Sequence, residues 1–153
     1  MSTIEEGVEV QVPVRTAYNQ WTQFEEFPEF MEGVESVKQL DDKRLHWKAE
    51  IMGVAKEWDA EITEQNPDER IAWTSTDGLF NSGVVTFHRL SDTASRVMLQ
   101  MKFNPDGFKE KAADALGIVE SRIKGDMKRF KDFIETRGAE TGAWRGEIEQ
   151  ENK

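Results

Sequence analysis

The chain has 153 residues, enough for one domain with a substantial core, and 30 acidic against 20 basic residues give it a net charge of −10. This charge disfavours nucleic acids and anionic membrane surfaces as partners, and the absence of cysteine excludes disulfides, thiol catalysis and cysteine-based metal sites. Because no basic region precedes an apolar run at the N-terminus and no segment approaches the length of a transmembrane helix, we expect a cytoplasmic protein without stable membrane insertion.

A strand and a short helix are the first predicted elements. Val8, Val10 and Val12 alternate with polar residues, which is typical of a strand with one apolar face. Pro13 ends this strand and suits the first turn of a helix. Apolar side chains, most of them aromatic, then follow at helical spacing and in the exit loop: Ala17, Trp21, Phe24, Phe27, Phe30 and Met31. Such a cluster can pack a core and also line an apolar cavity.

Six more strands are predicted in succession, joined by tight turns, at residues 33–40, 45–51, 55–64, 70–76, 84–90 and 96–103. Trp47, Trp58 and Trp73 occupy alternating positions that we assign to the inner face, where they pack against the last helix, line a cavity, or do both. Lys56 shares this face with Trp58 by alternation. We favour a bulge at Gly53 that turns Lys56 outward, and the alternative is that Lys56 anchors an anionic ligand group.

One long helix is predicted from Phe108 to Gly138, where the hydrophobic period changes from 2 to 3.6. Its apolar stripe consists of Ala112, Leu116, Val119, Ile123, Met127, Phe130 and Ile134. A helix with one such stripe needs the apolar face of the sheet to cover it. The residues after Gly138 have no period, so we expect one domain over residues 1–138 and a flexible tail over residues 139–153.

This order of elements resembles the helix-grip fold of the START-like (SRPBCC) superfamily. The resemblance is carried by the segments 12–14, 17–21, 24–31, 83–87 and 96–99. They are similar to bacterial polyketide cyclase/dehydrase-like proteins, a group with coenzyme Q-binding relatives. The resemblance implies an α+β fold in which a seven-stranded curved antiparallel sheet wraps around the long C-terminal helix. It also implies a deep cavity between sheet and helix for a hydrophobic or amphipathic small molecule, such as a lipid, an isoprenoid or a polyketide-like compound.

Motifs for other chemistry are missing from the sequence. We find no glycine-rich phosphate loop, dinucleotide fingerprint or nucleophile elbow. A two-histidine iron site, as in the ring hydroxylases of the superfamily, would need both His46 and His88, which fall in strands at half-exposed positions, so we predict no metal and no cofactor. Glu57, Asp59 and Glu61 share one strand face, which we interpret as solvated rather than as an acid–base site.

The sequence favours a binding protein that encloses a hydrophobic small molecule, and it assigns no catalytic residue. The predicted ligand-binding residues are Trp21, Phe24, Phe27, Phe30, Trp47, Trp58, Trp73, Phe87, Met101, Ile123 and Met127. A polyketide cyclase or dehydratase is the alternative, and its internal polar candidates are Tyr18, Lys56, Asn81, Ser82 and His88. A third hypothesis is a stress-related protein that binds a partner through the groove or Trp144. The ligand and the oligomeric state stay open.

Overall fold

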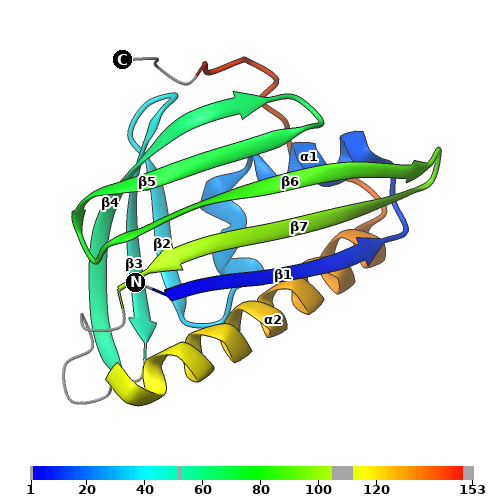
Figure 1. Cartoon of the computed structure of the whole chain (residues 1–153). Helices are drawn as coiled ribbons and strands as arrows, with labels where there is room; N and C mark the ends of the chain where they lie inside the picture. The colour runs from blue at the N-terminus through cyan, green and yellow to red at the C-terminus, as the bar shows by residue number, and fades with distance from the viewer. Residues whose placement is uncertain (1, 52, 105–111, 150–153) are drawn as a thin grey trace.

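A seven-stranded sheet and a long helix dominate the computed structural model, which describes residues 2–51, 53–104 and 112–149 (Figure 1). In chain order the elements are β1 (Ser2–Val10), α1 (Val14–Trp21), the 3-10 helix η1 (Phe24–Glu29), β2 (Val34–Gln39), β3 (Arg44–Ile51), β4 (Val54–Asn66), β5 (Arg70–Gly78), β6 (Asn81–Ser91), β7 (Ala94–Phe103) and α2 (Ala112–Arg137). The start of the predicted last helix, residues 108–111, lies outside the described residues.

The sheet is antiparallel throughout, in the order β1-β7-β6-β5-β4-β3-β2. The first strand pairs with the last along its whole length, from Ser2 opposite Phe103 to Val10 opposite Ser95. Register shifts interrupt the long strand β4 at two places, and such irregularities add local twist and curvature. The sheet therefore curves around the helices, which confirms the predicted α+β architecture.

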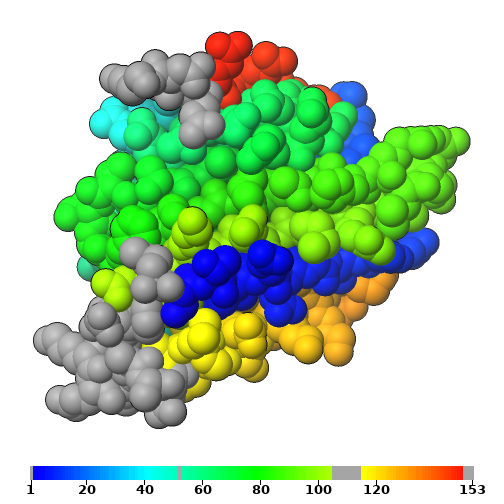
Figure 2. All heavy atoms as spheres, viewed as in Figure 1, coloured from blue at the N-terminus to red at the C-terminus, as the bar shows by residue number. Residues whose placement is uncertain are grey.

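The helix α2 runs beside β1 and closes the concave side of the sheet (Figure 1). In the space-filling view the blue residues of β1 lie between the yellow and orange helix and the green strands (Figure 2). The predicted stripe is correct at Val119, Met127, Phe130 and Ile134, which are all buried. It is wrong at Leu116, which is 40% exposed.

Ala115 takes the inward position that the stripe assigned to Leu116. It is fully buried and packs in a cluster with Ile4, Phe103 and Val119. Ala115 lies four residues before Val119, so both side chains point to the same face of the helix. A small side chain there lets the first turns of α2 approach β1 and β7 closely.

The rings of α1 and η1 turn inward. The carbonyl of Pro13 accepts the Ala17 N–H at 3.1 Å, so α1 begins directly after the proline. Trp21 then packs against Phe27 and Phe30, with ring centroids 5.5 and 6.1 Å apart. This short helical segment fills one end of the space between sheet and α2 with aromatic core.

The predicted bulge at Gly53 is wrong. The register between β3 and β4 runs without a shift from Arg44 opposite Glu61 to Ile51 opposite Val54. Lys56 therefore shares the inner face of β4 with Trp58, and its side chain is half-buried. Because the backbone pairing of β3 and β4 is regular here, inward and outward side chains alternate up to the last residue pair before the turn.

The sequence predicts a flexible tail after Gly138. In the structure the segment 139–149 returns along α1 and reaches β4 (Figures 1 and 2). The Thr141 N–H donates to Oε1 of Gln20 at 2.8 Å, and Nε2 of Gln20 donates to the Thr141 hydroxyl at 3.1 Å. Ile148 is buried and forms a two-bond antiparallel bridge with Gln65. The described part of the predicted tail is thus packed against the rest of the chain. The hydrogen bonds that hold it there leave no hydrophobic period in the sequence.

Candidate functional site

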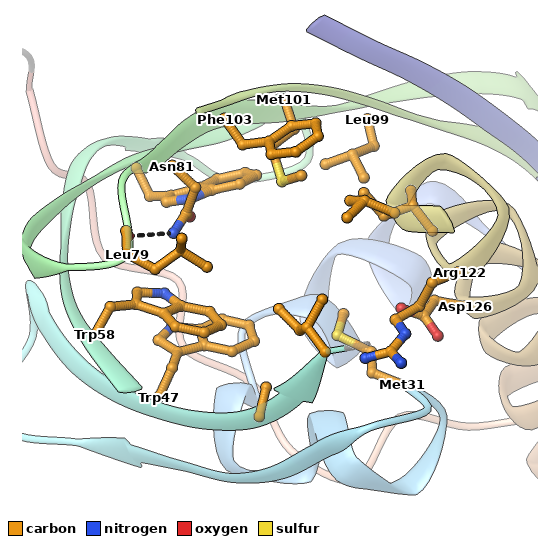
Figure 3. Close-up of a pocket in the computed structure, with 15 residues that line it drawn as sticks. Met31, Trp47, Trp58, Leu79, Asn81, Leu99, Met101, Phe103, Arg122 and Asp126 are labelled. Carbon is orange, nitrogen blue, oxygen red and sulfur yellow. Dashed lines mark hydrogen bonds between the residues drawn. The ribbon is translucent and has the colours of Figure 1, made fainter. Parts of the chain in front are cut away.

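An apolar cavity of about 150 Å³ lies between the concave face of the sheet and α2 (Figure 3). Twelve apolar side chains and three polar ones line it: Met31, Trp47, Ala49, Ile51, Trp58, Trp73, Leu79, Asn81, Leu99, Met101, Phe103, Val119, Arg122, Ile123 and Asp126. Strands β3 to β7 supply most of the wall, because their inward positions alternate with solvated ones. The helix α2 supplies the opposite side.

Two tryptophans form a flat wall of the cavity. Trp47 and Trp58 are directly opposite each other on β3 and β4. Their rings are stacked, with centroids 5.5 Å apart and planes 12° apart. Figure 3 shows the pair together at one side of the cavity. A wall of this kind favours contact with a planar or otherwise apolar group.

Trp73 forms the next part of the wall, and a glycine makes room for it. Gly83 lies opposite Trp73 on the neighbouring strand. A Cβ atom at Gly83 would lie 2.7 Å from Cη2 of the indole, closer than real side chains pack. The absence of a side chain at this position therefore allows the indole to lie across β6.

Asn81 fixes the orientation of that indole. Its Oδ1 accepts the Trp73 Nε1–H at 2.8 Å, and its own amide donates to the Leu79 carbonyl at 3.1 Å. The Asn81 N–H donates to Oγ of Ser75 at 3.0 Å. Since Asn81 is only 7% exposed, these contacts satisfy a polar group that would otherwise be costly to bury.

Two charged residues of α2, Arg122 and Asp126, lie across the cavity from Asn81 (Figure 3). The Arg122 guanidinium donates to the carbonyl of Glu50. The Asp126 carboxylate accepts the Glu32 N–H at 3.0 Å and pairs with Arg129. Burial raises the pKa of Asp126, and the hydrogen bonds from Arg129 and Glu32 oppose this rise. This half-exposed end is the polar rim of an otherwise apolar site.

The predicted binding residues divide into two groups. Five of them line the cavity: Trp47, Trp58, Trp73, Met101 and Ile123. The other six do not border it: Trp21, Phe24, Phe27, Phe30, Phe87 and Met127. The eleven residues do not all border one cavity, because the same aromatic periodicity serves both the core and the cavity wall.

The second group lies in three places. Phe24 and Phe27 line a separate cavity of about 50 Å³, whose wall also includes Trp47 and Trp73. The aromatic core around Phe130 takes up three more of the residues: Trp21, Phe30 and Phe87. Met127 is buried and borders a groove between β1 and α2. The segment from α1 to β2 therefore contributes one residue, Met31, to the main cavity.

Of the polar candidates for catalysis, only Asn81 lines the main cavity. Tyr18 is fully buried with its ring edge against Phe87, at a centroid distance of 5.2 Å. His88 is exposed and contacts the Thr86 hydroxyl at 3.0 Å. Lys56 and Ser82 do not border the cavity either. Among the described residues, three polar side chains thus line the main cavity, fewer than the five candidates from the sequence. Two of the three, Arg122 and Asp126, were not among those candidates.

Sequence reasoning missed Arg122 and Asp126 because it assigned α2 a narrow apolar stripe. Each of the two residues directly precedes a stripe residue, Ile123 or Met127, and the two are four residues apart. Positions at this spacing share one helix face, adjacent to the stripe. A predicted stripe widened to these neighbouring positions of α2 would have included both residues.

The two histidines lie far apart in the sheet. His46 is in β3 and His88 is in β6, with β4 and β5 between these strands. Nδ1 of His46 is 2.6 Å from Asp59 and Nε2 is 2.9 Å from Glu57, on the outer face. Within residues 2–51, 53–104 and 112–149, no group of three or more histidine, aspartate or glutamate side chains is arranged to hold a metal ion. No helix in the same part of the chain is long and apolar enough to cross a membrane.

Comparisons by sequence find a family and a related protein. A family model described as polyketide cyclase / dehydrase and lipid transport matches residues 10–132. An uncharacterized 17.2 kDa protein from the melC2-rnhH intergenic region of Streptomyces lincolnensis is 60% identical over 149 residues, which cover 97% of this chain and 99% of that protein.

Solved structures share the fold. The Zhui aromatase/cyclase from Streptomyces sp. R1128 superposes with a TM-score of 0.77 at 16% identity, over 94% of this chain and 99% of that one. A protein from Deinococcus radiodurans superposes with a TM-score of 0.69 at 26% identity, over 89% of this chain and 99% of that one. At its low identity, the likeness to the aromatase/cyclase shows the fold alone.

Proposed function

The chain belongs to the polyketide cyclase/dehydrase and lipid transport family, and from this premise we propose that it binds a hydrophobic or amphipathic small molecule in the cavity between the sheet and α2. The observation that carries the proposal is the cavity wall. Stacked Trp47 and Trp58 form an apolar surface together with Trp73, whose indole N–H is bonded to Asn81. The free energy falls when an apolar group replaces water on such a surface.

The size of the cavity bounds what it can enclose. Its volume is about 150 Å³, and an apolar cavity of that size in another protein stays dry and binds benzene. The separate cavity of about 50 Å³ shares Trp47 and Trp73 as wall residues. We therefore expect a ring system or a short acyl segment to be enclosed, with any larger portion of the ligand leaving past the polar rim.

A cyclase or dehydratase is the second candidate, and Asp126 is the observation that favours it. Its carboxyl lines the cavity, and its pKa is raised by burial, as a proton-transferring group requires. Against this role, Asp126 is already bound by the Glu32 N–H and by Arg129. Binding without chemistry is therefore the better-supported function.

Calorimetric titration of delipidated protein with 2-naphthylmethanol tests the proposal. We expect saturable binding that Trp73→Leu weakens, because the variant loses an aromatic surface of the cavity. Trp144→Leu is the matched control: it makes the same change at a half-buried tryptophan that does not border the cavity. Absence of binding by the delipidated unmutated protein, or equal weakening by both variants, would contradict the proposal.

A further inference from the structure

We propose that Arg122 binds the carboxylate of an amphipathic monocarboxylic acid whose apolar body occupies the cavity. This inference rests on the proposed function and names the ligand class. Among the described residues that line the cavity, Arg122 is the one cation. The other charged residue there is Asp126, which already has partners of its own.

The guanidinium of Arg122 has hydrogen-bonding capacity to spare. It carries five N–H donors, and its contact within the described residues is the bond from Nη1 to the Glu50 carbonyl. Its neighbour Asp126 forms its ion pair with Arg129 rather than with Arg122. A carboxylate can accept two parallel hydrogen bonds from such a group, which is the strongest common form of this interaction.

Gly33 leaves room for the Arg122 guanidinium at the rim of the cavity. Gly33 has a φ of +83°, a conformation that other residues rarely adopt. A Cβ atom there would overlap Nη1 of Arg122 and lie 2.7 Å from the Glu50 carbonyl oxygen. The empty space beside Gly33 therefore allows Arg122 to reach from α2 to β3 and keeps its charge beside the apolar cavity.

The surrounding charges favour a monoanion over a dianion. The positive charge of Arg122 lies close enough to Asp126 to lower the pKa of that carboxyl. A monocarboxylate gains the bidentate bond and faces a moderate repulsion from Asp126, whose charge Arg129 partly offsets. A phosphate dianion would double both the attraction to Arg122 and the repulsion from Asp126, and its second charge would have no cation to balance it among the described lining residues. An alcohol gains neither the charge nor the bidentate geometry.

A pair of probes with one ring system tests the inference: 2-naphthoate and 2-naphthylmethanol, titrated calorimetrically into delipidated protein. We expect the unmutated protein to prefer the carboxylate. Arg122→Gln should weaken 2-naphthoate about tenfold or more, the loss typical of a charge-assisted hydrogen bond, and leave 2-naphthylmethanol within about twofold. Lys124→Gln is the control, since it removes one positive charge from an exposed position of α2 that does not border the cavity.

The outcomes separate this inference from the proposed function. If 2-naphthylmethanol binds but Arg122→Gln leaves 2-naphthoate unchanged, the role of Arg122 is overturned and the cavity function stands. If neither probe binds the unmutated protein, both fail. Should Arg122→Gln fail to fold, Arg122→Lys decides, because it keeps the charge but loses the planar fork and should reduce the preference for the carboxylate. Binding of 2-naphthyl phosphate as tight as that of 2-naphthoate would overturn the restriction to monoanions.

Discussion

The ring of Phe130 on α2 lies edge-on against the indole of Trp21 on α1, with the two centroids 4.9 Å apart. Phe130 also contacts Phe30 at 5.3 Å and is fully buried. Aromatic core therefore holds the C-terminal half of the helix that closes the cavity, while Ala115 and Val119 pack nearer its start against Ile4 and Phe103. Stability and binding are expected to depend on different tryptophans.

Replacing Phe130 tests this attachment. Phe130→Ala should lower the free energy of unfolding by about 3–5 kcal/mol, the cost of a large aromatic truncation in a packed core. Asp132→Ala, at an exposed position of the same helix, should change it by less than about 0.5 kcal/mol. Chemical denaturation measures both. Equal stability of the two variants would mean that α2 does not pack as described.

Asn81 offers a prediction about the cavity wall. Asn81→Ala removes the acceptor of the Trp73 N–H and leaves a polar group without its partner. We expect a loss of about 1–3 kcal/mol in the free energy of unfolding, together with weaker binding of 2-naphthylmethanol. Ser82→Ala, at the next residue of β6 and outside the cavity, is the control. A variant that keeps both stability and affinity would show that Asn81 does not orient the indole.

His46 makes stability depend on pH. Hydrogen bonds to Asp59 and, less strongly, to Glu57 raise the pKa of His46 above its ordinary value of 6.5. The stabilisation from the charged ring is therefore fully present below about pH 6.5 and is lost as the pH rises through the higher pKa of the folded state. His46→Gln should lower the melting temperature more at pH 6 than at pH 9.

The effect should be small, because exposed ion pairs contribute about 0–1 kcal/mol. His88→Gln is the matched control, since the His88 ring contacts the Thr86 hydroxyl rather than a carboxylate. Melting curves of the three proteins at both pH values provide the measurement. A destabilisation by His46→Gln that is equal at the two values would rule out the charged histidine as its cause.

The segment after α2 gives a fourth prediction. Arg145 binds Asp68 at 2.8 Å and Asn19 at 2.6 Å, and its guanidinium lies over the ring of Tyr18. Arg145→Ala should cost about 1–3 kcal/mol in the free energy of unfolding, since it leaves partly buried polar groups unpaired. Arg137→Ala, at an exposed position, should cost less. Faster hydrogen exchange of the Ile148 amide in Arg145→Ala would show that the whole segment loosens.

Local patterns determined much of this fold. Alternation places the strands within a few residues, and the period of α2 is correct from Val119 onward. The start of β1 at Ser2 could not be predicted, since Glu6 and Gly7 interrupt the alternation and the pairing partner is the distant strand β7. Contacts of this kind depend on the assembled sheet rather than on neighbouring residues.

The site was less accessible to sequence reasoning than the fold. Trp47, Trp58 and Trp73 could be placed on the inner face because strand alternation determines the side of each residue. Phe24 and Phe27 could not be separated from them, because a helical segment and its exit loop do not reveal which of two cavities a ring faces. Arg122 is a charged residue that an apolar stripe excludes by definition.

The glycine beside Trp73 has a consequence for reading related sequences. A Cβ atom at residue 83 would overlap the Gln100 carbonyl oxygen and lie 2.7 Å from the Trp73 indole, so a methyl group at this position would force β7 or the ring to move. Residue 83 therefore bears on the position of one wall of the cavity, and it can be read from a sequence alone. Relatives with alanine here are expected to place the indole or β7 differently from relatives with glycine, and sorting homologues by this residue would group them by the shape of this wall.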